Sequence, residues 1–357
     1  MAAAALLIGG VVIVGRGHGS STSTATTTTV PPPTTAATTP ATTTTSLFVG
    51  QVAAGPALGQ PTGLVVYLTA PRQDHEVLFA LDLDQGLLRE VATTAHTPNE
   101  HPILGDAIVT PGARTEQLVH PEGATKALGT ATTSSFGAGR ADAYWEVSYT
   151  RDRSPSHAGL VLVGGPVERG VTIPAGFEVF AGDGIGGLLA RGPDDRTYRL
   201  PPDSGTLVAL DVNTPLAVAN GRVAAVACDA RPSCAVEIVD LTNGDRHVVP
   251  GSGPSSSGTS LSPDGTHLAQ VVATDDANQP ALIVIDTTSG DSLLHVPYLG
   301  VSFDSGPPRW SPDGAFLFWN DLNGLEWWRV TRIQPRTVRL PTTDSVSMSV
   351  VGVAAKT

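Results

Sequence analysis

One short motif occurs twice in the C-terminal third of the chain and constrains the fold more than any other feature. The segment Leu261-Ser-Pro-Asp-Gly-Thr-His-Leu-Ala-Gln-Val-Val recurs as Trp310-Ser-Pro-Asp-Gly-Ala-Phe-Leu-Phe-Trp-Asn. In each copy the proline presets the first turn position, and the glycine supplies the positive φ that a tight reversal needs. Each copy therefore predicts a strand, a tight turn and a second strand, followed by a further apolar run.

The motif predicts architecture rather than chemistry. A carboxylate in such a turn normally caps the backbone, so we interpret its aspartates as turn residues and not as catalytic acids. The structural turn residues are Pro263, Asp264, Gly265, Pro312, Asp313 and Gly314.

The rest of residues 47–357 also reads as short strands. Runs rich in Val, Leu and Ile alternate with turn residues, and the chain holds 39 glycines and 29 prolines, more than a helical protein tolerates. Such spacing indicates a sandwich, a barrel or a propeller. Weaker copies of the repeat at 219–245 and 181–200 favour an all-β propeller of six or seven four-stranded blades, with seven preferred.

Ser-Pro-Asp-Gly followed by a strand, and then by an apolar-Asp-Thr-x-x-Gly turn, resembles the TolB-like or WD-repeat-like blades of exported, membrane-anchored bacterial proteins. The resemblance is good for about residues 210–340 and only suggestive for residues 47–209. It implies a rigid disc with a central channel and loop-rich faces. Similar blades occur in periplasmic scaffolds, lipoproteins, extracellular sensor domains and the propeller halves of some peptidases.

Two segments precede the expected propeller. Residues 1–19 contain an apolar run that ends at Arg16, which we interpret as a truncated signal anchor or transmembrane segment, with a cleaved signal peptide as the alternative. Residues 20–46 are almost wholly Thr, Ser, Pro and Ala, which predicts a disordered linker. The expected location is the cell membrane, single-pass, with the propeller extracytoplasmic. Secretion after signal cleavage is the alternative.

Both cysteines lie close together, on either side of a short turn-like segment. Cys228 and Cys234 would face each other near the tip of a hairpin, which predicts a disulfide. Two unpaired thiols are the alternative, and a zinc site is disfavoured because no further Cys or His pair lies nearby. A disulfide would persist only in an oxidising compartment.

Charge and motifs exclude several classes of function. The net charge of −12 should repel nucleic acid and anionic lipid head groups, so membrane contact is expected only through the N-terminal segment. We find no HExxH, P-loop, GxSxG or EF-hand motif. The sequence thus predicts no metal, no cofactor and no catalytic residues.

Aromatic residues supply the candidate binding sites. Four tryptophans crowd the last expected blade, and an aromatic pair near the middle of the chain lies beside Arg151. Strand alternation would send Trp327 and Trp328 to opposite faces, so we expect one of them in the core between blades. The full set of candidates is Tyr144, Trp145, Arg151, Trp310, Trp319, Trp327 and Trp328.

The C-terminal end of the chain should close the ring. A run near Ser345 to Val353 follows the last recognisable blade, and it could pair with the segment from Phe48 to Ala53. Such pairing would remove exposed strand edges.

These features favour a non-catalytic extracytoplasmic binding or scaffold module that uses one propeller face for a protein, peptide or glycan of the cell envelope. One alternative is the extracellular sensor domain of a longer membrane protein. Another is a propeller hydrolase or lyase with an active site at the channel mouth, which three or more Asp, Glu or His side chains gathered there would favour.

Overall fold

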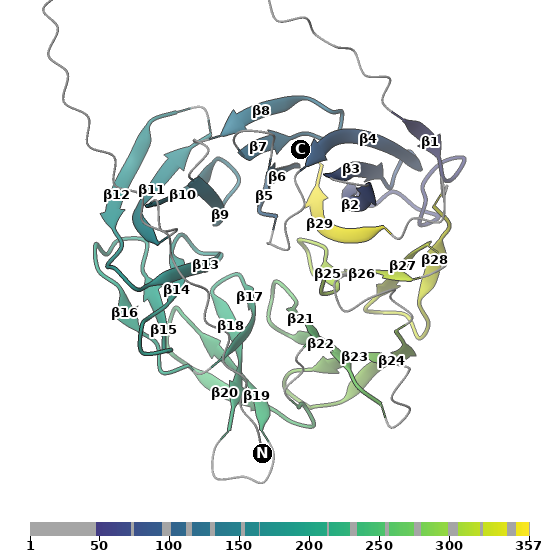
Figure 1. Ribbon diagram of the computed structural model, residues 1–357. Coiled ribbons are helices and arrows are strands. Elements are labelled where there is room, and N and C mark those ends of the chain that lie inside the picture. The colour runs from purple at the N-terminus through teal and green to yellow at the C-terminus, as the bar shows by residue number, and fades with distance from the viewer. Residues whose placement is uncertain are drawn as a thin grey trace, which may run out of the picture. The chain divides into compact units, whose positions relative to one another are not determined.

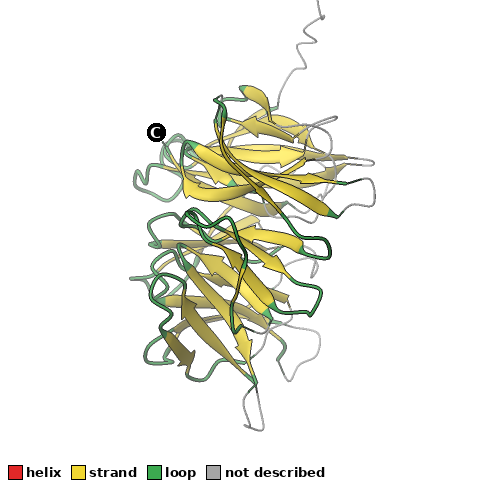
Figure 2. Ribbon diagram, turned by 90° about the vertical axis from the view of Figure 1, so that its left-hand side faces the viewer, coloured by secondary structure: helices red, strands yellow, loops and turns green. Residues whose placement is uncertain are grey.

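The computed structural model describes residues 48–356 apart from short segments at 73–74, 95–100, 112–115, 129–132, 151–153, 164, 213, 229–233, 254–256, 275–279, 299–305, 322–323 and 341–347. Within the described residues every regular element is a β-strand (Figure 2). These residues belong to one compact unit, Ser46–Thr357. The predicted all-β class is confirmed.

The strands form seven antiparallel sheets, the blades of a propeller (Figure 1). Blade 1 contains β1 (Val49–Gln51), β2 (Leu64–Arg72), β3 (His75–Asp82), β4 (Leu87–Thr94) and β29 (Ser349–Ala355). Blade 2 contains β5 (Ile103–Leu104), β6 (Ala107–Pro111), β7 (Glu116–Val119) and β8 (Thr125–Leu128). Blade 3 contains β9 (Thr133–Arg140), β10 (Ala143–Tyr149), β11 (Pro155–Leu162) and β12 (Val167–Thr172).

The remaining four blades continue around the ring in chain order. Blade 4 contains β13 (Glu178–Gly182), β14 (Leu188–Arg191), β15 (Thr197–Leu200) and β16 (Val208–Ala209). Blade 5 contains β17 (Pro215–Ala219), β18 (Arg222–Ala227), β19 (Ala235–Asp240) and β20 (Arg246–Val249). Blade 6 contains β21 (Ser257–Leu261), β22 (His267–Val272), β23 (Ala281–Asp286) and β24 (Ser292–Pro297). Blade 7 contains β25 (Arg309–Trp310), β26 (Phe316–Asp321), β27 (Gly324–Arg329) and β28 (Arg336–Val338).

The ring has two distinct faces. The innermost strands, β29, β5, β9, β13, β17, β21 and β25, surround the centre in Figure 1. Because successive strands are antiparallel, all innermost strands begin at one face, where the second strands also end. We call this the loop face. The opposite turn face carries the first-to-second and third-to-fourth strand connections.

The repeated motif forms two turns on the turn face. In blade 6 the Asp264 carboxylate accepts hydrogen bonds from the Ser262 hydroxyl at 2.6 Å and from the backbone amide two residues after the aspartate at 3.1 Å. Gly265 has a φ of 74°, where a side chain would be strained. Blade 7 repeats these contacts at Asp313, and Gly314 has a φ of 70°. Both carboxylates are therefore engaged in local turn contacts.

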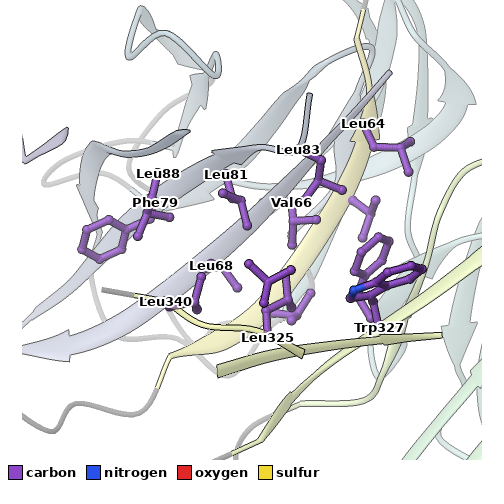
Figure 3. Close-up of a cluster of buried hydrophobic side chains, with 14 of the residues drawn as sticks. Leu64, Val66, Leu68, Phe79, Leu81, Leu83, Leu88, Leu325, Trp327 and Leu340 are labelled. Atoms are coloured by element: carbon purple, nitrogen blue, oxygen red, sulfur yellow. The ribbon is translucent and has the colours of Figure 1, made fainter. Parts of the chain in front are cut away.

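Neighbouring blades pack face to face, and the contact between blades 7 and 1 shows how (Figure 3). Leu325 and Trp327 of β27 point toward apolar side chains of β2 and β3. Alternate residues of a middle strand face opposite sides of its sheet, and in a ring both sides are covered by another blade. The labelled members of this cluster are Leu64, Val66, Leu68, Phe79, Leu81, Leu83, Leu88, Leu325, Trp327 and Leu340.

A buried ion pair adds a polar link between blades 4 and 5. Arg199 Nε donates to Asp183 Oδ2 at 2.7 Å, and Arg199 Nη1 donates to the backbone carbonyl of Leu241 at 2.7 Å. The other carboxylate oxygen accepts the backbone amides of Ile185 at 2.9 Å and Gly187 at 2.7 Å. The Asp183 side chain is completely buried, so these partners replace the water that the carboxylate loses on folding.

The C-terminal strand closes the ring in a way that differs from the prediction. As predicted, the strand returns to blade 1, but it pairs with β2 at the channel edge, where Val353 lies opposite Val66. The segment that begins with Val49 pairs instead with β4 at the outer edge. The predicted partner was therefore wrong. The seven consecutive residues Leu64–Ala70 of β2 are all buried, as expected for a strand with neighbours on both edges and a blade on each side.

Lys356 anchors the end of β29 through a backbone hydrogen bond and two ion pairs. Its backbone amide donates to the Gly63 carbonyl at 2.8 Å. Its ammonium lies 2.6 Å from Asp82 Oδ1 and 3.3 Å from Asp84 Oδ2. These contacts join the last described residues to the blade 1 turn.

The predicted disulfide is present. A bond links Cys228, just after β18, to Cys234, just before β19. It crosses the second-to-third strand connection of blade 5 and therefore lies on the loop face.

The predicted anchor at 1–19 and linker at 20–46 lie outside the described residues. In the part of the chain that the structure describes, no helix is long and apolar enough to cross a membrane.

Candidate functional site

A cavity of about 610 Å³ opens on the channel side of blades 2 to 5. Its wall includes the innermost strands β9, β13 and β17, together with the ends of β6 and β10 and the starts of β7 and β11. All of these ends belong to the loop face. The cavity and the repeated turns therefore lie on opposite faces of the ring.

Glu116 is the most unusual group in the cavity wall. Its Oε2 atom is buried and has no hydrogen-bond partner among the described residues. Burial raises the pKa of this carboxyl, and the negative charge of Glu146 adds to the rise. The backbone amide and the hydroxyl of Ser135 lie close to the carboxylate and oppose the rise, but Oε2 itself accepts no hydrogen bond.

Ser135 is the second unsatisfied group. The residue is 5% exposed, and its hydroxyl makes no hydrogen bond within the described chain. A buried polar atom without a partner costs free energy, on the order of 1–3 kcal/mol. Two such groups side by side in the wall of one cavity are the pattern expected where a ligand or water completes the hydrogen bonding.

Further acidic and phenolic groups surround this pair. Glu146 lies opposite Ser135 in the β9–β10 register, and burial raises the pKa of its carboxyl. Burial also raises the pKa of the Tyr149 phenol, and the charges of Glu116 and Glu178 raise it further, against a hydrogen bond with Ser134. Tyr149 thus keeps its proton at neutral pH. Among the described residues that line the cavity, none is a lysine or an arginine.

Aromatic and proline side chains form the rest of the wall. Phe136 of β9, Phe180 of β13 and Phe177 just before β13 line the cavity together with Tyr149. Phe177 is fixed by an edge-to-face contact with Tyr198, with ring centroids 4.9 Å apart. The cavity therefore combines apolar aromatic surface with carboxylates.

His101 lines the same cavity but is engaged in the fold. It is 8% exposed, and its Nδ1 donates to the Val109 carbonyl at 3.1 Å. Burial lowers the pKa of its imidazole, and the charge of Arg309 lowers it further. The ring is therefore neutral at pH 7 and positions the start of blade 2.

The structure places the sequence-predicted aromatic residues between blades rather than on a surface. Tyr144 packs toward blade 2 and Trp145 toward blade 4. Trp327 packs toward blade 1, and Trp328 packs toward blade 6. The two tryptophans do point to opposite faces, but both faces are covered, so both are core residues.

Trp310 and Trp319 are also buried, in the cluster between blades 6 and 7. The blade 3 pair and the blade 7 tryptophans are therefore not brought together. Arg151 lies outside the described residues. None of these buried rings presents a surface to a partner in this conformation, and we do not include them in the candidate site.

Sequence reasoning missed the residues that line the cavity. Glu116, Ser135 and Glu178 line it and come from β7, β9 and β13, and no local motif connects them. Single acidic residues near strand ends usually face solvent. The available signal was only that Glu116 and Glu178 begin strands at the loop face, which requires the blade register to be known.

Metal chemistry gains no support from the described residues. Among them, no group of three or more His, Cys, Asp or Glu side chains is placed to hold a metal ion. His101, Glu116 and Glu178 share the cavity wall, but they do not converge on one point as ligands would. Three such side chains do line one cavity on the channel side of the ring, the gathering that would favour a channel-mouth enzyme, but they are not placed as metal ligands.

Comparison with known proteins supports the fold and no narrower assignment. No family model and no curated protein matches the sequence. Among solved structures, the chain is similar to the Pyrococcus horikoshii acylaminoacyl peptidase, with 11% identity, a TM-score of 0.54, and coverage of 80% of this chain and 51% of the peptidase.

Two further solved structures are matched at lower TM-scores. TolB from Acinetobacter baumannii has 16% identity, a TM-score of 0.44, and coverage of 67% of this chain and 64% of TolB. A putative 6-phosphogluconolactonase from Bacteroides fragilis has 12% identity, a TM-score of 0.47, and coverage of 81% and 97%. The chain spans less than two thirds of the TolB and peptidase chains. The fold itself, a ring of seven sheets with Ser-Pro-Asp-Gly turns, is the propeller that the repeat predicts.

Proposed function

We propose that this protein is a non-catalytic, extracytoplasmic binding or scaffold module, and that it engages a protein or peptide of the cell envelope through the loop face. Residues 1–19 would attach it to the membrane and residues 20–46 would act as a spacer. The disulfide between Cys228 and Cys234 supports an oxidising compartment. A glycan partner is the alternative occupant.

One observation carries the proposal: the loop-face cavity has two adjacent buried polar groups, Glu116 and Ser135, whose hydrogen bonding is incomplete within the described chain. Concave sites of roughly 300–1,000 Å³ with mainly apolar walls and a few polar groups are typical of ligand-binding pockets. The turn face, by contrast, uses its aspartates in its own turns.

Site-specific photocrosslinking in the native envelope tests which face is used. A photoreactive phenylalanine analogue is placed at Phe177, a half-buried ring of the cavity wall, or at Thr288, an exposed residue of a turn-face turn. We expect a discrete crosslinked product from position 177 and none from position 288. Crosslinking only from position 288, or from neither position, would contradict the proposal.

A propeller hydrolase or lyase is the second candidate. Its support is Glu116, because burial raises the pKa of this carboxyl toward the range in which a general acid or base works best. Screening the purified full-length protein against peptide, ester and uronate substrates tests it. Turnover that is lost in Glu116→Gln would favour this candidate over a binding module.

The sensor alternative uses the same loop face and stays a prediction. A change in a cytoplasmic signalling activity of the protein when a ligand fills the cavity would favour the sensor over the scaffold.

A further inference from the structure

We propose that the loop-face cavity receives a cationic group, the guanidinium or ammonium of an arginine or lysine side chain on a peptide or protein partner. This inference rests on the proposed function and narrows its ligand class.

Charge is the first argument. Glu116, Glu146 and Glu178 contribute three carboxylates in or beside the cavity, whereas no described lysine or arginine lines it. These three carboxylates disfavour an anionic ligand, although the charge of Arg309 also reaches the wall at His101. A cation would be attracted, and the overall net charge of −12 would add long-range steering of a basic partner.

Unsatisfied hydrogen bonding is the second, independent argument. Glu116 Oε2 and the hydroxyl of Ser135 are both buried without a partner in the described chain, and both residues line the cavity. A guanidinium carries five donors in a planar fork, and an ammonium carries three. Either group could donate to both oxygens at once, which a neutral carbonyl-rich ligand could not do.

The aromatic wall is the third argument. Phe136, Phe177, Phe180 and Tyr149 line the same cavity as the carboxylates. Their ring faces attract cations, and their edges can cover the methylene stem of a long basic side chain. Aromatic rings next to carboxylates therefore match a side chain that is apolar along its length and charged at its end.

The alternatives fit less well. A divalent metal would need several converging ligands, and the described residues contain no such group. A neutral glycan would satisfy the hydroxyl of Ser135 but would leave Glu116 without a counter-charge. The cavity volume of about 610 Å³ suits one side chain with its flanking backbone rather than a folded surface.

Fluorescence anisotropy with the full-length protein tests the inference. The probes are labelled tetra-arginine and tetra-lysine peptides, with tetra-citrulline as the neutral shape analogue of arginine and tetra-glutamate as the anionic control. We expect both basic peptides to bind and the other two not to bind. Equal binding of the citrulline and arginine peptides would overturn the inference.

Matched variants separate the cavity from general surface charge. Glu116→Gln and Glu178→Gln each remove one negative charge at the cavity, whereas Glu122→Gln removes one from an exposed turn-face position. We expect each cavity variant to weaken binding of the arginine peptide by about tenfold or more, and the control to change it less than about twofold. Equal effects of cavity and control variants would show nonspecific attraction and overturn the inference.

Thermal unfolding of each variant shows whether it is folded, and Glu178 is exposed, so its substitution should leave the fold intact. The two proposals fail separately. Crosslinks from position 177 in the envelope, combined with no preference for basic peptides, would leave the loop face as the binding surface and remove only the cationic ligand.

Discussion

Removal of the closing strand tests the ring most directly. Deletion of residues 349–357 removes β29, whose Val350, Val353 and Ala354 side chains are buried. At about 0.8 kcal/mol for each buried CH₂-sized group, these side chains contribute roughly 5 kcal/mol. Whole domains are stable by only about 5–15 kcal/mol, so the deletion should unfold the domain or lower its urea midpoint severely.

A point variant tests the same contact between β29 and β2 if the truncated chain does not fold. Val353→Ala removes two methyl groups from the contact with β2 and should cost about 2 kcal/mol. Val208→Ala makes the same change at a side chain that is 50% exposed on the outer strand β16, and it should have little effect. Urea unfolding followed by intrinsic fluorescence measures both. A deletion variant with the wild-type midpoint would refute closure through β29.

Three further changes test other parts of the fold. Arg199→Met leaves the buried Asp183 carboxylate without its counter-charge and should lower the free energy of unfolding by about 3–5 kcal/mol. The control Arg196→Met removes a largely exposed ion pair and should change this free energy little. Urea titrations measure both. Burial raises the pKa of Asp84, but backbone hydrogen bonds and the Lys356 ammonium outweigh burial and lower it overall. Its stabilisation is therefore present above the unfolded-state pKa of about 3.9 and is lost as pH falls through the folded-state pKa. Asp84→Asn should flatten that acid limb in urea midpoints measured from pH 7 to pH 2.5, and an unchanged limb would contradict this assignment. Finally, alkylation of the unfolded, unreduced protein should add no mass at Cys228 and Cys234, and reduction should lower the stability by about 2 kcal/mol.

The repeat predicts the architecture well because a turn motif fixes strand order locally. Each Ser-Pro-Asp-Gly turn lies between two strands as expected, the first between β21 and β22 and the second between β25 and β26. A tight turn needs particular residues at fixed offsets, so it can be recognised from a single sequence. Seven blades follow once the same spacing is continued toward residue 47.

Ring closure was harder to predict because pairing between distant strands leaves no local signal. The apolar run Leu64–Ala70 is buried at every position, whereas the Val49–Gln51 strand is mostly exposed. An unbroken apolar run is typical of a strand with neighbours on both edges and both faces covered. That pattern favours β2 as the partner of the C-terminal strand.

The aromatic clusters illustrate the opposite difficulty. Trp327 and Trp328 could be core or binding residues from sequence alone, since large rings are used in both roles. The ring decides between these roles, because each blade is covered on two sides and its middle strands have no free face. The cavity, in turn, is built from blades 2 to 5, so it exists only after the ring has formed.

The buried acid of the cavity gives a last prediction, because a group held for ligand binding should reduce stability. Burial raises the pKa of Glu116 in the folded protein, and the nearby Glu146 adds to the rise. The folded state therefore binds this proton more tightly than the unfolded state does. The sign follows from linkage: stability is fully present below the unfolded-state pKa and is lost as pH rises through the folded-state pKa. At pH 7, above the unfolded-state pKa, this difference costs stability, so Glu116→Gln should raise the urea midpoint while it weakens binding of the arginine peptide. At a pH below the unfolded-state pKa of about 4.3 the acid is protonated in both states, and the two midpoints should converge.

Glu122→Gln, with its exposed side chain, should change neither quantity. A Glu116→Gln variant that loses both stability and binding at pH 7 would show instead that the carboxylate is a structural element of the cavity wall.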